Sequence, residues 1–165
     1  LAQGIDDRRV VSERQAKSIS NETTFAHDIS DEAALHASLM ELTEQVASRL
    51  RHTGLVGRTV NLKLRFADFK TLSRSQTLEK PSQTTEVLWQ TVSKLFGQCK
   101  RVLPVRLIGM GVSNLMPENE QGQEQAELFA TIDPRQQQLD ELADTINTRF
   151  GKATLHRGSS TRRNN

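Results

Sequence analysis

Residues 59–69 alternate between apolar and polar or basic side chains, and this pattern constrains the fold more than any other segment. The apolar members are Val60, Leu62, Leu64 and Phe66, and the polar members between them are Asn61, Lys63 and Arg65. Successive side chains of a strand point to opposite faces of its sheet. The segment therefore predicts a strand with one face against a core and a basic face toward water.

Two further segments carry apolar residues at spacings of three and four, which is typical of amphipathic helices. The first follows Ser30, the predicted N-cap, has Asp31 and Glu32 at its positive end, and ends at Gly54. The second is predicted over residues 84–99, after a break at Pro81 and Ser82. Each helix has one apolar side to bury.

Three more strands are predicted, over residues 15–25, 71–78 and 105–115, and Gly109 and Gly111 loosen the last one. The order is strand, helix, strand, strand, helix, strand. It indicates an α+β fold, the split βαβ (βαββαβ) arrangement of a four-stranded sheet with two helices on one face. The other face of the sheet is then open to a partner.

The chain divides into four parts along its 165 residues. Residues 1–14 are predicted to be a polar linker that follows another domain, and 15–116 to form the α+β domain. Residues 117–132 are expected to be an acidic, flexible spacer, and 133–165 to form a C-terminal helical extension with a disordered basic tail. That helix starts with Asp133 as N-cap and Pro134, stops at Gly151, and is expected to dock on the two preceding helices. Its apolar stripe comprises Leu139, Leu142, Ile146 and Phe150.

Positive charge is concentrated in one part of the chain. The formal net charge is only +2, but residues 56–80 contain six lysines and arginines and two acids. This local excess indicates an anionic partner for the segment. The alternative is a basic sheet face that is simply solvated.

The sequence contains no pattern typical of catalysis or of a metal site. Cys99 is the single cysteine, which excludes an internal disulfide and a multi-cysteine zinc site, and the four histidines have no ligand spacing. Among the adjacent acidic pairs, Asp6–Asp7 lies in the linker and Asp31–Glu32 is explained by the start of a helix. No apolar run approaches about 20 residues, so a membrane span is not expected. With no signal-peptide pattern at the start of the sequence, a cytoplasmic location is expected.

Several motifs in order give the sequence a family resemblance. They are KSISNETTF (residues 17–25), VASRLR at the end of the first helix, LRFADFKTLSRSQTL (64–78) and VRLIGMGVSNL (105–115). Together they resemble the little-finger domain of Y-family DNA polymerases, specifically the DNA polymerase IV branch. The upstream DDRRVVSERQAK resembles the tether from the catalytic core of such enzymes.

The resemblance implies a module that holds primer–template duplex DNA for an error-prone translesion polymerase, a nucleotidyltransferase. Lysines and arginines would neutralise phosphates and hydroxyls would donate to them, contacts that carry no sequence information. The DNA-binding residues implied are Lys17, Ser18, Ser20, Thr23, Lys63, Arg65, Lys70, Arg74 and Ser75. The chain itself would be inactive and bind no cofactor, because the carboxylates that hold magnesium in the parent polymerase lie in another domain.

A second motif lies in the acidic spacer. Gln125, Leu128 and Phe129 resemble the peptide by which bacterial polymerases bind the sliding clamp, although Ala126 stands where the usual pattern has leucine. Two large apolar residues on a solvated arm could fill a pocket of the clamp. Alternatively, Leu128 and Phe129 pack on the sheet or on the last helix.

Two rival functions use the same fold. A ferredoxin-like RNA-binding domain needs exposed aromatic residues on the middle strands, and Phe66 and Phe69 are the available candidates. The other rival is the same domain in a catalytically inactive Y-family relative that acts as a clamp-bound adaptor. Upstream metal-binding carboxylates would distinguish an active polymerase from an adaptor.

Overall fold

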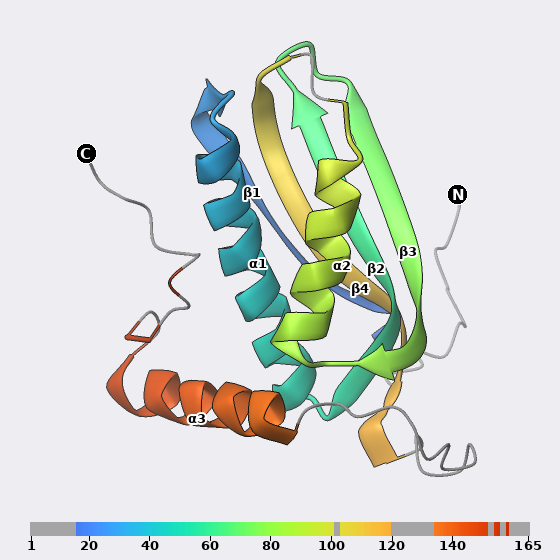
Figure 1. Cartoon of the computed structure of the whole chain (residues 1–165), viewed down its shortest axis with the longest axis vertical. Coiled ribbons are helices and arrows are strands. Elements are labelled where there is room, and N and C mark those ends of the chain that lie inside the picture. The colour runs from blue at the N-terminus through green and yellow to red at the C-terminus, as the bar shows by residue number, and fades with distance from the viewer. Residues whose placement is uncertain (1–15, 101–102, 120–133, 152–153, 156–157, 159–165) are drawn as a thin grey trace, which may run out of the picture.

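The computed structural model describes residues 16–100, 103–119, 134–151, 154–155 and 158. Four strands and two helices build the main body, and a third helix follows at its lower end (Figure 1). In chain order the elements are β1 (Ser18–Ile29), α1 (Glu32–His52), β2 (Leu55–Phe66), β3 (Thr71–Ser82), α2 (Thr85–Gly97), β4 (Val105–Pro117) and α3 (Pro134–Phe150). Among the described residues, no helix is long and apolar enough to cross a membrane.

The sheet confirms the predicted split βαβ arrangement. Its strand order is β1-β4-β2-β3, and every neighbouring pair is antiparallel. Strands β1 and β2, joined through α1, therefore run parallel with β4 inserted between them. Strands β3 and β4, joined through α2, run parallel with β2 between them. Helices α1 and α2 cover one face of this sheet (Figure 1).

The core lies between the two helices and that face. Val60, Leu62 and Leu64 of β2 are at most 1% exposed, which confirms the predicted alternation. On β4, Ile108, Met110 and Val112 pair with these residues and belong to the same core cluster. The paired rows fix which side of each strand faces the helices.

The ends of several elements differ from the prediction. Helix α1 is capped by Asp31 rather than Ser30, because the Asp31 carboxylate accepts a hydrogen bond from the Ala33 N–H at 3.1 Å. Gly54 adopts a positive φ of 62°, so the chain reverses at once and β2 begins at Leu55 instead of residue 59. The strand ends at Phe66, since Asp68 and Phe69 form the turn into β3.

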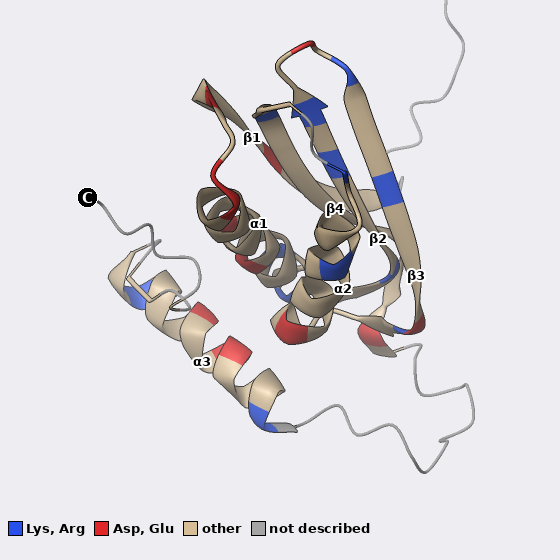
Figure 2. Ribbon diagram, turned by 45° about the horizontal axis from the view of Figure 1, so that its top comes forward, with Lys and Arg blue, Asp and Glu red and all other residues tan. Residues whose placement is uncertain are grey.

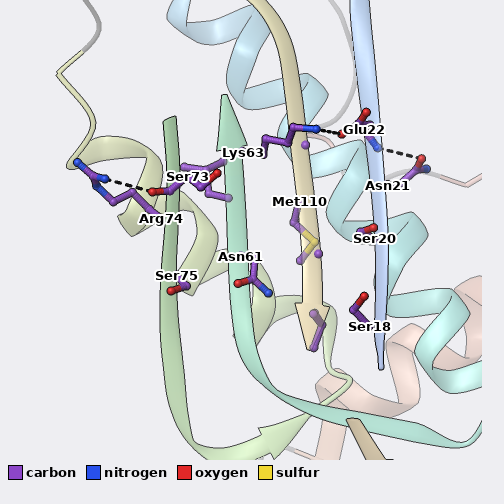
Figure 3. Close-up of a pocket in the computed structure, with 14 residues that line it drawn as sticks. Ser18, Ser20, Asn21, Glu22, Asn61, Lys63, Ser73, Arg74, Ser75 and Met110 are labelled. Carbon is purple, nitrogen blue, oxygen red and sulfur yellow. Dashed lines mark hydrogen bonds and ion pairs between the residues drawn. The ribbon is translucent and has the colours of Figure 1, made fainter. Parts of the chain in front are cut away.

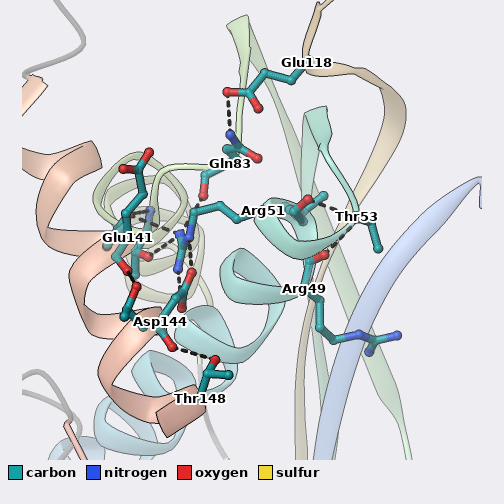
Figure 4. A network of polar contacts seen from close by, with 12 residues as sticks. Arg49, Arg51, Thr53, Gln83, Glu118, Glu141, Asp144 and Thr148 are labelled. Atoms are coloured by element: carbon teal, nitrogen blue, oxygen red, sulfur yellow. Dashed lines mark hydrogen bonds and ion pairs between the residues drawn. The ribbon is translucent and has the colours of Figure 1, made fainter.

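Helix α3 docks on the ends of α1 and α2, but through acidic residues rather than its apolar stripe. Asp140 and Asp144 bind the guanidinium of Arg51, at the C-terminal end of α1 (Figure 4). Leu139, Leu142 and Phe150 of the stripe remain 55%, 56% and 66% exposed. The expected docking on the helices is thus observed, but three of the four residues of the apolar stripe face water.

Candidate nucleic-acid interface

The face of the sheet that α1 and α2 leave uncovered, here the open face, carries small polar groups and two basic residues. The strand register assigns residues to it, because side chains in one paired row point the same way. One row runs Ser20, Gly111, Asn61, Ser75, and the next runs Glu22, Gly109, Lys63, Ser73. Ser18 lies in the row before them, and Arg65 and Thr71 lie in the row after.

Two glycines make the centre of this face concave. Gly109 and Gly111 stand in β4 where alternation would otherwise put side chains over the middle of the sheet. An added Cβ at Gly111 would lie 2.7 Å from the Ser20 Cβ, and one at Gly109 would lie 2.9 Å from the Glu22 Cβ. The result is a shallow pocket of about 450 Å³ floored by β4 and flanked by β1, β2 and β3 (Figure 3).

The basic residues of the open face sit on β2. Lys63 Nζ lies 2.8 Å from Glu22 Oε2, and in Figure 3 the Lys63 side chain reaches across the β4 ribbon toward Glu22. Arg65 Nε donates to Thr71 Oγ1 at 3.1 Å, which is a neutral partner. Figure 2 shows blue segments on β2 and β3 both near the β2–β3 turn and toward the opposite end of these strands.

Two predicted DNA-binding residues point to the helix-covered side instead. Arg74 pairs with Leu62, and Thr23 pairs with Ile108, both of which belong to the core. In Figure 3 the Arg74 side chain leaves β3 away from the pocket, and its Nη1 donates to the Ser73 carbonyl oxygen at 3.1 Å. The sequence pattern contains this information, because Arg74 is in phase with Leu72, which packs against the core.

Lys17 and Lys70 lie at the margins of the sheet. Lys17 is exposed immediately before β1, and Lys70 is in the β2–β3 turn with its side chain 84% exposed. Lys70 Nζ lies 2.9 Å from Asp68 Oδ2. Hydrogen bonds from the side chain and the main chain of Lys70 lower the pKa of Asp68 from its usual 3.8.

The open face thus brings together five of the predicted residues, namely Ser18, Ser20, Lys63, Arg65 and Ser75. Sequence reasoning placed Asn61 on this face but not among the DNA-binding residues, and it missed Glu22 and Ser73, which are in phase with them. It assigned no such role to Gly109 and Gly111. The signal for Glu22 was its period-two spacing from Ser18 and Ser20. That it meets Lys63 depends on the insertion of β4 between β1 and β2, which no local pattern encodes.

The predicted aromatic alternatives do not lie on the open face. Phe66 packs against the core, and Phe69 is 64% exposed in the turn with the Arg106 guanidinium 4.9 Å from its ring centroid. Within the described residues, no group of three His, Cys, Asp or Glu side chains could hold a metal ion. The spacer motif with Gln125, Leu128 and Phe129, the linker 1–14 and Asp133 lie outside the described residues.

A protein-family model matches residues 16–128 of this chain, and its description is impB/mucB/samB family C-terminal domain. A protein of Caulobacter vibrioides named DNA polymerase IV is 36% identical over 158 residues, which are 96% of this chain and 38% of that protein. A Streptomyces coelicolor protein of the same name is 40% identical over 115 residues, which cover 70% of this chain and 24% of that protein. The chain therefore spans well under half the length of these relatives.

Solved structures share the fold. One is described as a complex of the beta-clamp processivity factor and the little finger domain of PolIV. It is 24% identical with a TM-score of 0.51, over 70% of this chain and 98% of that one. A Y-family DNA polymerase chimera is 17% identical with a TM-score of 0.50, over 63% of this chain and 30% of that one. These similarities confirm the predicted α+β fold.

Proposed function

Because this chain belongs to the impB/mucB/samB family as its C-terminal domain, we propose that its open face holds the sugar–phosphate backbone of duplex DNA. The family match and the relatives named DNA polymerase IV bear out the resemblance stated from the sequence. The observation that carries the proposal is the helix-free sheet face with Lys63 and Arg65 beside a glycine-floored pocket.

The chemistry of this face suits phosphates rather than bases. Ser20, Ser73 and Ser75 present hydroxyls that can donate to phosphate oxygens, and Lys63 and Arg65 supply positive charge. Gly109 and Gly111 of β4 leave room for the sugar–phosphate backbone of a duplex to approach the sheet closely. Contacts of this kind fix the position of a duplex without reading its sequence, as required of a polymerase domain that acts at any site.

The single-stranded RNA alternative lacks support on the open face. RNA-binding sheets of this type stack bases on aromatic side chains of their middle strands. On β2 and β4 the corresponding open-face positions hold Asn61, Lys63, Gly109 and Gly111. The proposal therefore favours a duplex.

The test is fluorescence anisotropy of the full chain with a labelled duplex, comparing Lys63→Gln and Arg65→Gln with Arg74→Gln. All three remove one positive charge from the sheet, but Arg74 leaves it on the helix-covered side. We expect the first two to weaken binding to all duplex sequences alike, and Arg74→Gln to weaken it less. Equal losses for all three would refute the assignment to the open face.

We propose the residue pattern Gln125, Leu128 and Phe129 as a sliding-clamp peptide. Support comes from its position after the sheet domain and from a structural neighbour described as a complex with the beta-clamp. Replacing Leu128 and Phe129 with Ala should abolish retention of the chain on an immobilised clamp and leave duplex affinity unchanged. Clamp retention equal to the unmodified chain would refute this motif.

For the parent protein we propose DNA-directed DNA polymerase activity on damaged templates, in the cytoplasm, with magnesium held by carboxylates of a preceding catalytic core. The described residues provide no carboxylate cluster for that ion, so no catalytic step is assigned to this chain. The alternative is an inactive, clamp-bound adaptor. Primer extension by the full-length protein tests the difference, and an absence of extension with magnesium and all four nucleotides would favour the adaptor.

A further inference from the structure

The open face contains a carboxylate beside one of its two basic residues. Glu22 is the acidic residue of its central rows, and its Oε2 lies 2.8 Å from Lys63 Nζ. Both side chains are well exposed, at 52% for Glu22 and 40% for Lys63. The ion pair is therefore accessible to a ligand rather than a buried structural link.

The geometry of the sheet explains how the two residues meet. Glu22 and Lys63 are both paired with Gly109, from opposite sides of β4. Adjacent strands lie about 4.8 Å apart, so roughly 10 Å separates the backbones of Glu22 and Lys63. A Cβ at position 109 would lie 2.9 Å from the Glu22 Cβ and 3.6 Å from its Oε2. The missing side chain of Gly109 thus gives Glu22 a path across the strand.

We propose that Glu22 is an internal counter-ion of Lys63 that a DNA phosphate displaces, so that Glu22 limits the affinity of the open face for duplex DNA. This inference rests on the proposed function of that face. A carboxylate and a phosphodiester each carry one negative charge, so the displacement exchanges one Lys63 partner for another. An exposed ion pair contributes little stability, so a phosphate can replace it.

Arg65 provides the contrast within the same strand. Its Nε donates to the Thr71 hydroxyl, which brings no charge that a phosphate must displace. A phosphate that binds Lys63 must therefore displace the Glu22 carboxylate, whereas a phosphate that binds Arg65 displaces only a neutral hydroxyl. Removing the Glu22 charge should strengthen the contribution of Lys63 specifically.

The experiment measures duplex affinity of the full chain by anisotropy for Glu22→Gln, with Glu41→Gln as the matched control. Glu41 is an exposed residue of α1 that bonds Gln45, so its substitution changes the net charge equally but away from the open face. We expect Glu22→Gln to bind about two- to fivefold tighter, the range of an exposed ion pair. Its plot of log affinity against log salt should be steeper by up to about 0.9. Glu41→Gln should bind like the unmodified chain.

Repeating Glu22→Gln in a Lys63→Gln background shows whether the effect passes through Lys63. Loss of the gain in that background supports the counter-ion role. A gain of unchanged size there, or equal gains from Glu22→Gln and Glu41→Gln, overturns it, since Glu22 would then act only by general repulsion of DNA. If Lys63→Gln and Arg65→Gln weaken binding but Glu22→Gln has no effect, this inference fails and the proposed function stands. If neither basic substitution matters, the proposed function itself fails.

Discussion

Replacement of Arg51 by alanine should destabilise the domain and release α3. The Arg51 guanidinium joins three elements: its Nε lies 2.6 Å from Asp144 Oδ2 and its Nη1 lies 3.2 Å from Asp140 Oδ2 of α3. The same Nη1 donates to the Gln83 carbonyl oxygen at 3.1 Å and to Thr85 Oγ1 at 3.2 Å, where α2 begins. Figure 4 shows Arg51, Gln83 and Asp144 converging between α1, α2 and α3.

The burial of the network sets the magnitude. The side chains of Arg51, Asp140 and Asp144 are 11%, 5% and 17% exposed. Removing one partner of a buried ion pair costs about 3–5 kcal/mol, because the remaining charge is left without compensation. In Arg51→Ala, however, α3 can detach and return both carboxylates to water, which limits the loss. We therefore expect the lower end, about 3 kcal/mol, or roughly 6–12 °C in Tm for a chain of this size.

The assay is urea unfolding of the full chain, followed by the fluorescence of Trp89, which packs against the core. Hydrogen exchange of the peptide covering 134–150 reports α3 separately. Arg49→Ala is the matched control, since Arg49 is an exposed arginine on the same helix whose Nη1 bonds the Ser20 carbonyl oxygen at 3.2 Å. We expect this control to lose less than about 1 kcal/mol and to keep α3 protected.

A specific result would refute this reasoning. If Arg51→Ala and Arg49→Ala lose the same stability and the amides of α3 exchange equally slowly in both, the ion-pair network does not hold the helix. Should Arg51→Ala fail to fold, Asp144→Asn is the milder test, because Arg51 keeps its bond to Asp140. It should cost about 1.5–3 kcal/mol, the range for a hydrogen bond to a charged group.

Three further predictions concern the sheet and its turn. Gly111→Ala should lower the free energy of unfolding in urea by about 1–3 kcal/mol, because the added Cβ would lie 2.7 Å from the Ser20 Cβ. The control Gly97→Ala, with open space around it, should lose no stability. Equal effects of the two substitutions would contradict the close approach of β1 and β4. The Asp68 carboxyl should titrate below 3.8 by NMR and return toward that value in Lys70→Gln. Since folding lowers the pKa of Asp68, its contribution to stability should be present above pH 3.8 and be lost as pH falls through the folded pKa. An unchanged Asp68 titration in Lys70→Gln would show that Lys70 does not cause the lowered pKa. Finally, if Lys63 and Arg65 on the open face each neutralise one phosphate, log duplex affinity should fall with log salt at a slope of about −2. A slope near zero would contradict phosphate contacts.

The arrangement of the domain could be predicted because its helices and strands are long and strongly periodic. The alternation over residues 59–69 identified the buried side of β2 correctly, and Val60, Leu62 and Leu64 define it in the structure. Helix and strand ends were less predictable, because they depend on single hydrogen bonds. The choice of Asp31 over the neighbouring Ser30 as N-cap is such a case.

The candidate site was predicted only in part, because charge alone does not say which face of an edge strand a residue occupies. Arg74 belongs to the basic segment 56–80, yet it is in phase with Leu72 and Leu78, whose side chains face the core. Thr23 is likewise in phase with Ile19 and Phe25. Applying alternation to each strand separately would have placed both residues correctly. The Glu22–Lys63 pair could not be found this way, since it depends on strand order.

The docking of α3 shows why an apolar stripe is not always the side of a helix that binds. Arg51 is fixed where the C-terminal end of α1 meets the start of α2, and a nearly buried guanidinium requires acceptors with negative charge. The start of α2 adds a second demand, because Thr84 makes no side-chain cap and the Thr85 N–H needs an acceptor. Asp140 Oδ2 serves both groups, since it lies 3.2 Å from Arg51 Nη1 and accepts a hydrogen bond from the Thr85 N–H at 2.9 Å. The acidic side of α3 must therefore face the domain, and this orientation leaves Leu139 and Leu142 in water.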